Sequence, residues 1–275
     1  MQKKGVDISE HNGSVDFQAL KNAEVQFAIL RLGYGSDYVS QDDSRFSENV
    51  RKAETAGMPW GAYLYSYAKT AAMAQSEAQH ALRLLAGKKP AYGVWFDVED
   101  GQISSADVVT TSQTFCGAME AAGVYAGIYA SLSWLNGKLD SPLLDKYDKW
   151  VAQWNSICTY KKPYGIWQFT DSLAVSGKNF DGNWAYKDYP SIVQAMNEPE
   201  KEEPELTEAE VKEIARQEME AYFAELAKKP VSPWAQAAVE SVLARGLMRG
   251  DADGSFRPQS FITRQEVAAV LENLS

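Results

Sequence analysis

The chain has 275 residues, of which 45% are hydrophobic and 12% aromatic, and its formal net charge is −10. This composition fits one large domain, or a domain of about 200 residues with a smaller appendage, and it excludes global disorder. An acidic chain without a basic stripe is a poor candidate for binding nucleic acid. The sequence has no apolar run of roughly 18 or more residues, so it predicts no membrane-spanning helix.

Strand-like and helix-like segments alternate through the first two-thirds of the sequence. The strand-like runs are GVDIS (5–9), FAILRLG (27–33), GAYLYSYA (61–68), YGVWFDVE (92–99) and VYAGIYAS (124–131). Helical patterns follow the first four runs, near 15–22, 45–56, 70–87 and 106–122. This repetition predicts parallel strands that are covered by helices.

Helical patterns fade after the fifth strand-like run. The remaining strand-like runs are KWVAQWN (149–155), YGIWQFT (164–170) and FDGNW (180–184). About five βα units followed by three strands predict an α/β fold, an irregular TIM-like barrel of eight strands. Barrel enzymes carry their chemistry at the carboxyl ends of the strands, so residues at these ends are the first candidates for a site.

Acidic residues recur at the predicted strand ends. Asp97 and Glu99 end the fourth strand, Asp7 lies toward the end of the first, and Asp181 belongs to the last. Alternate residues of a strand share a face, so Asp97 and Glu99 are expected to point the same way, about 7 Å apart. A pair of solvated charges is an equally good interpretation of a lone D-x-E pattern. The spread of acids and aromatic residues over six strands favours a shared cleft.

Paired carboxylates in an aromatic cleft are typical of glycoside hydrolysis, in which a protonated acid serves the leaving oxygen and a second carboxylate assists the developing cation. Core packing is the alternative interpretation of each aromatic residue. The sequence contains only two histidines, His11 and His80, which leaves few residues for a zinc site or a Ser-His-Asp triad. No phosphate-binding glycine motif supports nucleotide use. An acidic Mg²⁺ site at the barrel mouth is the main chemical alternative.

Seven short motifs carry a resemblance to a known family. In chain order they are GVDISEHNG, RLGYG, GAYLYSYA, FDVED, GIYAS, GIWQFT and FDGN. Together they resemble glycoside hydrolase family 25, the bacterial and phage muramidases, over roughly residues 3–190. The resemblance implies a peptidoglycan hydrolase that needs no cofactor and no metal, and that cleaves the β-1,4 bond between N-acetylmuramic acid and N-acetylglucosamine.

The resemblance also implies roles for individual residues. Glu99 corresponds to the general acid. Asp97 either orients the N-acetyl group of the substrate, which then attacks the anomeric carbon, or is itself the nucleophile. Asp7 and Asp181 correspond to two further acids that position groups and tune the pKa of the general acid. The expected sugar contacts are Tyr34, Tyr65, Tyr129 and Trp154.

The composition changes near residue 197. Residues 198–228 contain 11 acidic and 4 basic residues, and the segment NEPEKEEPELTE has the composition of an extended, exposed linker. A long amphipathic helix is predicted over 207–229, because Thr207 and Glu210 form a capping-box pattern. Its apolar stripe consists of Val211, Ala215, Met219, Tyr222 and Leu226.

The last 45 residues or so resemble one S-layer homology repeat. Trp234 and Val239 match its first helix, Gly246 and Gly250 its turn, residues 253–258 (DGSFRP) its loop, and residues 262–266 (ITRQE) the start of its second helix. A calcium-binding EF-hand loop from Asp251 is excluded, because its twelfth position is Ile262. These repeats usually occur in threes to bind wall polysaccharide, so a single copy leaves that role open.

The sequence therefore predicts a catalytic barrel (1–195), an acidic linker (196–206) and an all-α module (207–275) that binds the cell wall, oligomerises, or both. Exposed apolar stripes generally find partners, which favours a homo-oligomer, dimer or trimer, through 207–275 over a helix folded back on its module. Without an apparent signal peptide, we expect synthesis in a host cytoplasm and action on the wall after release; a secreted autolysin is the second choice. The alternative function is a non-catalytic protein that binds wall glycan.

Overall fold

A computed structural model describes residues 2–197, 207–251 and 255–274. The chain divides into two compact units, Met1–Pro199 and Glu200–Ser275. Most of the predicted linker, residues 198–206, lies outside the described residues, as do Asp253 and Gly254 of the predicted repeat loop.

The described residues of the first unit form a closed barrel of eight strands that pair in chain order. Every neighbouring pair from β1 to β7 is parallel, whereas β8 is antiparallel to both β7 and β1. The strands are β1 Lys3–Ile8, β2 Phe27–Tyr34, β3 Trp60–Tyr65, β4 Val94–Asp97, β5 Ala126–Ser131, β6 Asp148–Ala152, β7 Ile166–Val175 and β8 Lys178–Ala185.

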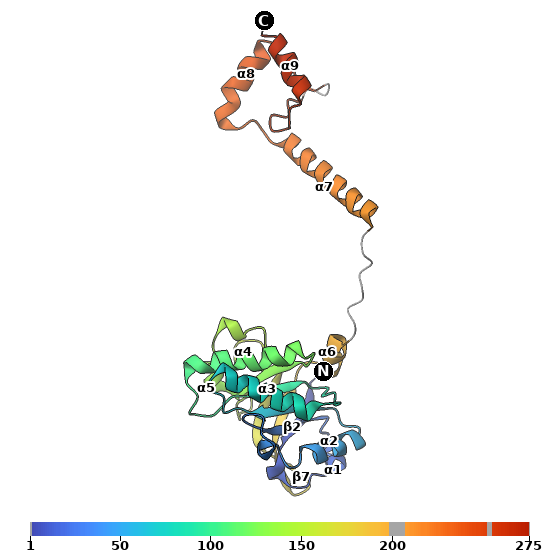
Figure 1. Ribbon diagram of the computed structural model, residues 1–275, viewed down its shortest axis with the longest axis vertical. Helices are drawn as coiled ribbons and strands as arrows, with labels where there is room; N and C mark the ends of the chain where they lie inside the picture. The colour runs from blue at the N-terminus through green and yellow to red at the C-terminus, as the bar shows by residue number, and fades with distance from the viewer. Residues whose placement is uncertain (1, 198–206, 252–254, 275) are drawn as a thin grey trace. The chain divides into compact units, whose positions relative to one another are not determined.

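Helices follow the strands as the sequence predicts, with a full helix after each of the first four and a short one after β5 (Figure 1). They are α1 Phe17–Asn22, α2 Phe46–Thr55, α3 Ala71–Leu85, α4 Ser105–Ala121, α5 Leu132–Leu135 and α6 Tyr189–Asn197, with 3₁₀ turns η1 Glu10–Asn12, η2 Val39–Gln41 and η3 Pro142–Leu144. Thr70 and Ser104 cap α3 and α4 through their hydroxyls. The predicted irregular TIM-like barrel is confirmed.

Several predicted strands differ from the observed ones. β4 ends at Asp97, so Glu99 lies on the following loop and not on the strand. β6 ends at Ala152, which places Trp154 beyond it. β7 and β8 extend into a long antiparallel hairpin, because the turn at Ser176 and Gly177 adopts positive φ and reverses the chain. Periodicity alone reveals neither the direction of a strand nor the residue at which it stops.

Aromatic rings fill the barrel interior, and glycines on neighbouring strands make room for them. A Cβ atom at Gly127 would lie 2.4 Å from the ring of Trp95, and one at Gly5 would lie 2.3 Å from the ring of Phe27. These contacts are too short for any side chain, so the rings occupy the space that the glycines leave open. The interior cluster consists of Phe27, Ile29, Tyr92, Trp95, Tyr129, Trp150, Ile166, Ala185 and Tyr189.

A buried carboxylate lies near the amino-terminal ends of the strands. Oδ2 of Asp148 accepts hydrogen bonds from the hydroxyls of Tyr125 (3.0 Å) and Tyr189 (2.6 Å) and pairs with Nζ of Lys187 (3.0 Å). Burying a charge is favourable only when it is paired and hydrogen-bonded, and here each requirement is met. This network stabilises the end of the barrel that lies away from the predicted site.

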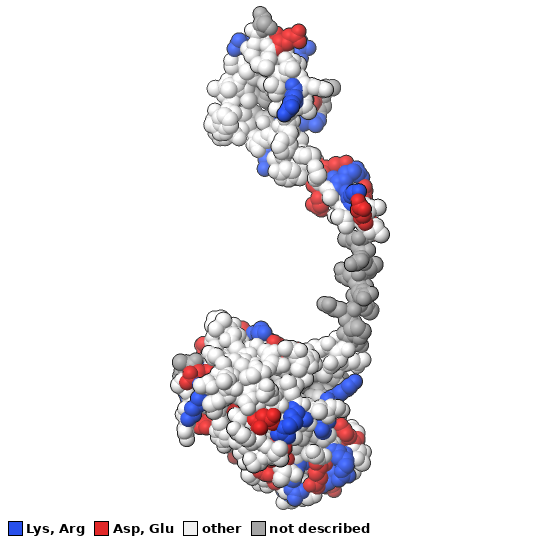
Figure 2. Space-filling model, in the orientation of Figure 1, with Lys and Arg blue, Asp and Glu red and all other residues white. Residues whose placement is uncertain are grey.

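The C-terminal unit contains α7 Glu208–Lys228, η4 Pro233–Ala235, α8 Gln236–Ala244 and α9 Arg264–Glu272. The predicted capping box of Thr207 and Glu210 is present, and Thr263 and Glu266 form another at the start of α9. Charges of both signs alternate along α7 (Figure 2). Within the described ranges, no helix is both long enough and apolar enough to cross a membrane.

Candidate active site

A cavity of about 340 Å³ lies at the carboxyl ends of the parallel strands. All four acids that the sequence singles out line it. The lining residues are Asp7, Ser9, His11, Asn12, Arg31, Tyr63, Tyr65, Asp97, Glu99, Tyr129, Gln168 and Asp181. Residues from both ends of the barrel sequence therefore meet in one cleft, where the rule for barrel enzymes places chemistry.

Asp97 lies at the centre of a row of side chains that runs across three strands. In the strand register it is paired with Tyr65 of β3 on one side and with Tyr129 of β5 on the other. The residue is 4% exposed, and its Oδ1 has no hydrogen-bond partner within the described part of the chain. Burial, followed by the charges of Glu99 and Asp7, raises the pKa of Asp97 well above its usual range. A buried acceptor without a donor is costly, so this oxygen is suited to a donor from a ligand.

Glu99 lies two residues further along, on the loop that follows β4. The residue is exposed at the mouth of the cleft, where it can reach a ligand. Its carboxyl is partly shielded from solvent; this burial and then the charge of Asp181 raise the pKa of Glu99 above its usual value. A carboxyl that keeps its proton at higher pH is suited to act as an acid.

Asp7 and Asp181 face each other across the antiparallel pair of β1 and β8. Oδ2 of Asp7 accepts hydrogen bonds from Nδ2 of Asn183 (2.8 Å) and Nε2 of Gln168 (3.0 Å). Burial and then the nearby charge of Asp181 raise the pKa of Asp7 well above its usual range, and burial raises the pKa of Asp181. Asp7 is buried and Asp181 half-buried, and two such close carboxyls cannot both ionise easily, so the pair favours a state with one proton.

Gln168 and Asn183 are functional candidates that sequence reasoning missed. Gln168 also accepts hydrogen bonds through Oε1 from the hydroxyl of Tyr129 (3.1 Å) and from Nε1 of Trp154 (3.1 Å). Oδ1 of Asn183 accepts a hydrogen bond from Nε1 of Trp150 (2.7 Å). Both residues lie inside quoted motifs, GIWQFT and FDGN. Their position beside acids and aromatics was the available signal, but an uncharged amide does not reveal its partners from sequence.

Arg31 is a second lining residue that the sequence analysis did not single out. Its guanidinium bonds to Oδ2 of Asp43 at 2.8 Å and to Oε1 of Glu10 at 2.9 Å. The positive charge of Arg31 is therefore paired with these two carboxylates. Arg31 lowers the pKa of Asp97, but burial and the charges of neighbouring acids raise that pKa by more. The cleft therefore keeps an excess of acids, which favours a proton on some of its carboxyls while others stay ionised.

The four predicted aromatic contacts divide into two groups. Tyr65 and Tyr129 line the cavity. Tyr34 and Trp154 do not: the ring of Tyr34 packs edge-on against Tyr67 at 6.1 Å, and Trp154 is 61% exposed beyond the end of β6. Trp154 lies beyond the early end of β6, from where its indole N–H reaches the lining residue Gln168. Contact of Tyr34 and Trp154 with sugar stays a prediction.

Metal binding is the alternative use of these acids. No group of three or more histidine, cysteine, aspartate or glutamate side chains among the described residues is arranged to hold a metal ion. At Asp7, two amide N–H groups already point at Oδ2, and such donors repel a cation. The donor set of the cleft is thus arranged for hydrogen bonding.

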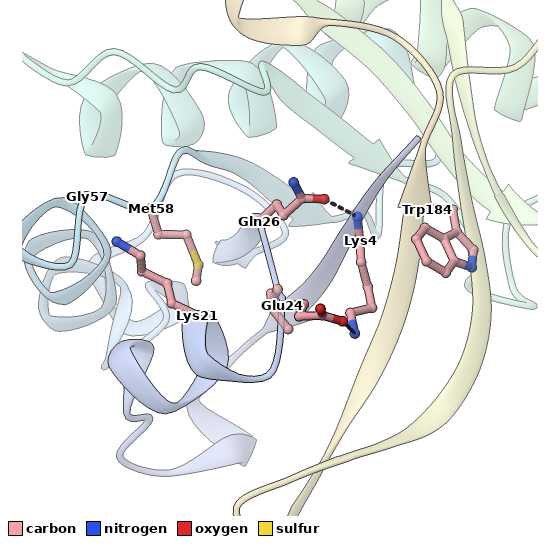
Figure 3. A pocket seen from close by; sticks show the side chains of 8 residues that line it. Lys4, Lys21, Glu24, Gln26, Gly57, Met58 and Trp184 are labelled. Atoms are coloured by element: carbon pink, nitrogen blue, oxygen red, sulfur yellow. Dashed lines mark hydrogen bonds and ion pairs between the residues drawn. The ribbon is translucent and has the colours of Figure 1, made fainter. Parts of the chain in front are cut away.

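A second hollow of about 570 Å³ lies near the amino-terminal ends of β1 to β3 (Figure 3). Several of its polar groups already have protein partners. The backbone N–H of Lys4 donates to Oε1 of Gln26 (3.2 Å), Nζ of Lys4 pairs with Glu24 (3.9 Å), and Nζ of Lys21 donates to the carbonyl of Ala56 (2.5 Å). This hollow lacks the unpartnered buried acceptor that distinguishes the cleft.

Comparison with known proteins identifies both units. The family described as "Glycosyl hydrolases family 25" matches residues 6–178, and the "S-layer homology domain" matches residues 228–268. A curated relative, "Probable GH family 25 lysozyme 4" of Dictyostelium discoideum, is 28% identical over 200 residues, 66% of this chain and 89% of the relative.

Two solved structures extend the comparison. The modular autolysin LytC of Streptococcus pneumoniae, in complex with a synthetic peptidoglycan ligand, has a TM-score of 0.62 and 27% identity, over 67% of this chain and 47% of that one. This chain therefore matches about half the length of that autolysin. The catalytic domain of the endolysin ply40, from a bacteriophage of Listeria monocytogenes, has a TM-score of 0.60 and 25% identity, over 70% of this chain and 98% of that one.

Proposed function

The chain belongs to glycosyl hydrolase family 25, and from this premise we propose that it is a muramidase, which cleaves the β-1,4 bond between N-acetylmuramic acid and N-acetylglucosamine in peptidoglycan. Similarity to the autolysin solved with a peptidoglycan ligand supports this substrate. The observation that carries the proposal is the acid arrangement at the end of β4: a buried carboxylate with a free acceptor oxygen two residues before an accessible acid.

Glu99 acts as the general acid in this proposal. Its raised pKa keeps a proton on the carboxyl, and its exposure at the cleft mouth lets that proton reach the glycosidic oxygen. The proton moves to this oxygen as the bond from the oxygen to the anomeric carbon breaks. The resulting Glu99 carboxylate then accepts a proton from the water that completes hydrolysis.

Asp97 assists at the anomeric carbon. Its unpartnered Oδ1 is an acceptor for the N–H of the substrate acetamide, whose carbonyl oxygen then attacks the anomeric carbon. In the alternative route, the Asp97 carboxylate attacks the carbon itself and forms a glycosyl-enzyme ester, as retaining glycosidases do. Mass analysis of trapped enzyme distinguishes the routes, since a covalent sugar on the peptide that contains Asp97 occurs only in the second.

Asp7 and Asp181 adjust the charge of the cleft. Gln168 and Asn183 orient Asp7 through two hydrogen bonds, and Asp7 and Asp181 together favour a single shared proton. The remaining negative charge raises the pKa of Glu99. Their proposed role is therefore to keep the general acid protonated.

Product analysis tests the proposed bond. Purified peptidoglycan is digested with the full chain, and the released fragments are reduced and examined by mass spectrometry. New reducing-end muramic acid supports the muramidase. Reducing-end glucosamine or freed peptide stems contradict it, and binding without any release supports the non-catalytic alternative.

We further propose that the C-terminal unit binds the cell wall and assembles the chain as a dimer or trimer through residues 207–275. The exposed fractions of Val211, Met219 and Tyr222 on α7 are 50%, 57% and 58%, so most of the predicted stripe is uncovered; Leu226 is the buried exception. Linked copies would raise avidity for a repetitive wall by roughly 10²–10⁴-fold.

Light scattering tests this assembly on the full chain. We expect a dimeric or trimeric mass at micromolar concentration, and a monomeric mass after Val211, Met219 and Tyr222 are all replaced by serine. These side chains are exposed, so the replacements leave the helix itself folded. A monomeric mass for the unaltered chain contradicts the proposal.

The route to the wall is a separate proposal. Similarity to a phage endolysin supports synthesis in a host cytoplasm and action after release. Fractionation of producing cells tests it: we expect the enzyme in the cytoplasmic fraction until the membrane is permeabilised. Its steady appearance in the medium of intact cells supports the secreted autolysin instead.

A further inference from the structure

Three tyrosines form a continuous aromatic row beside the cleft. Tyr34, at the end of β2, packs edge-on against Tyr67 (centroids 6.1 Å apart), and Tyr67 packs against Tyr65 at 5.2 Å. Tyr65 lines the cavity. Tyr34 and Tyr65 are strand residues and are register partners, whereas Tyr67 lies on the loop between β3 and α3. The position of Tyr67 therefore depends on what holds this loop.

Glu77 of α3 anchors this loop through hydrogen bonds from its side chain. Its side chain is fully buried. Oε1 accepts the backbone N–H of Tyr67 at 2.8 Å, and Oε2 accepts the hydroxyl of Ser66 at 2.7 Å. Oγ of Ser66 in turn accepts the backbone N–H of Ala68 at 3.1 Å. One carboxylate thus fixes, directly or through Ser66, three consecutive residues of the loop.

A buried carboxylate at this position costs folding stability. No ion pair involves Glu77 among the described residues, and burial raises its pKa to about 7. Packing alone would be served better by an apolar side chain of similar volume. What a carboxylate adds is two acceptor oxygens in a fixed plane, which match the N–H of Tyr67 and the hydroxyl of Ser66. The chemistry of the residue therefore matches loop positioning.

The same helix fixes the neighbouring loop. His80, one turn along α3, contacts the carbonyl of Gly35 through Nδ1 (3.0 Å) and Oδ1 of Asp42 through Nε2 (2.8 Å). The guanidinium of Arg83 also bonds to both carboxylate oxygens of Asp42 and lowers the pKa of that carboxyl. Gly35 directly follows Tyr34. The contact of His80 with Gly35 therefore fixes the backbone next to Tyr34, and Tyr67 packs against the ring of Tyr34.

We propose that Glu77 is a positioning residue, which places Tyr67 between Tyr34 and Tyr65 so that the three rings form a contact surface for the apolar face of a sugar ring. This inference rests on the proposed muramidase function. Glu77 touches neither the cleft nor the substrate, and it acts through the backbone of Tyr67. It affects substrate binding more than the chemical step, because the acids lie on other elements.

A double-mutant cycle on the full chain tests this role. Glu77→Gln, Tyr67→Ala and the double variant are assayed for KM and kcat on soluble peptidoglycan fragments, beside the control Gln79→Ala on the exposed side of α3. Glutamine keeps the size of Glu77 but has one acceptor oxygen instead of two, so the hydrogen bond that Oε2 accepts from the Ser66 hydroxyl is lost. We expect each single variant to raise KM roughly 2- to 10-fold, with kcat changed less than about 2-fold.

The double variant decides between positioning and general support. If Glu77 acts through Tyr67, the double variant has the KM of Tyr67→Ala alone; independent effects that multiply overturn the proposal. So does a folded Glu77→Gln enzyme with unchanged KM. If Glu77→Gln does not fold, Ser66→Ala replaces it in the same cycle, because it removes one link of the network.

Failure of this inference can be separated from failure of the proposed function. Product analysis of the unaltered chain reports the bond that is cleaved, whatever the variants do. If the product carries reducing-end muramic acid but the KM effects of the two single variants multiply in the double variant, only the positioning role is contradicted. Different products sink the muramidase, and the inference with it.

Discussion

The barrel and the C-terminal unit differ in how far their largest aromatic side chains are exposed to solvent. In the barrel, Trp95 and Trp150 are almost fully buried against neighbouring rings, whereas Trp234 and Phe261 of the C-terminal unit are 88% and 75% exposed. A domain that buries its aromatic residues has a hydrophobic core that needs no partner. A short unit that exposes them has surface left for a ligand or for other copies of the chain.

Charged groups differ between the units in the same way. The barrel places Asp7 and Asp97 in a buried cleft where their pKa values rise, while the charges of α7 form exposed pairs such as Glu208 with Lys212. Exposed pairs contribute little, about 0–1 kcal/mol each. Buried acids cost stability and are retained for chemistry. On our proposal the barrel carries out turnover and the C-terminal unit attaches the chain to the wall, a division that the following variants test.

The largest effect is expected at Glu99. Glu99→Gln removes the proton donor but keeps its size, so hydrolysis falls roughly 10²–10⁴-fold. The residue is exposed on a loop, so circular dichroism should show an unchanged fold. Asp100→Asn on the same loop is the matched control and should stay active. Clearing of cell walls by Glu99→Gln at the normal rate contradicts the assignment.

Asp97→Asn should be nearly as severe. The amide cannot be a nucleophile, and it accepts hydrogen bonds less strongly than a carboxylate. Removal of a buried acid with a raised pKa should also make the barrel more resistant to heat at neutral pH, because the desolvation cost disappears. Turnover and thermal unfolding are measured on the same preparation. Asp7→Asn and Asp181→Asn should lose less activity. Loss of both activity and stability at Asp97 would instead indicate a structural role.

The pH dependence of hydrolysis follows from the charge beside Glu99. The general acid works only when protonated, so activity is present below its pKa and is lost as the pH rises through it. The charge of Asp181 raises that pKa, so Asp181→Asn should move the alkaline limb of kcat/KM to lower pH. The limb is measured on soluble fragments. An unchanged limb, or one moved to higher pH, contradicts the electrostatic role.

A smaller and more selective effect is expected in the C-terminal unit. Replacing Trp234 and Phe261 with serine should lower retention on isolated cell walls roughly tenfold, because exposed aromatic residues are frequent binding hot spots. Hydrolysis of soluble fragments should not change. Sedimentation with wall material measures the first quantity and product release the second. A parallel loss of both would show that the two units do not divide the work.

The sequence predicts the barrel well because its signals are local. Alternating apolar runs locate the strands, and helical patterns locate the helices that follow the first four of them. The four acids are found because they lie on predicted strands and within the motifs that carry the family resemblance. That logic misses Gln168 and Asn183, whose roles depend on which strands become neighbours across the barrel closure. It misses Glu77 for a similar reason: on α3 it looks like an ordinary helix glutamate, and only burial reveals its partners.

The smallest effect expected is that of chelation. Two amide N–H groups point at Oδ2 of Asp7, so a cation bound there would displace Gln168 and Asn183 from hydrogen bonds that orient the acid. We therefore expect hydrolysis of soluble fragments to survive dialysis against EDTA unchanged. Activity that disappears and returns with Mg²⁺ would support the metal-dependent alternative. If EDTA lowers lysis of whole walls but spares the soluble substrate, the metal acts in attachment, and the division between the two units stands.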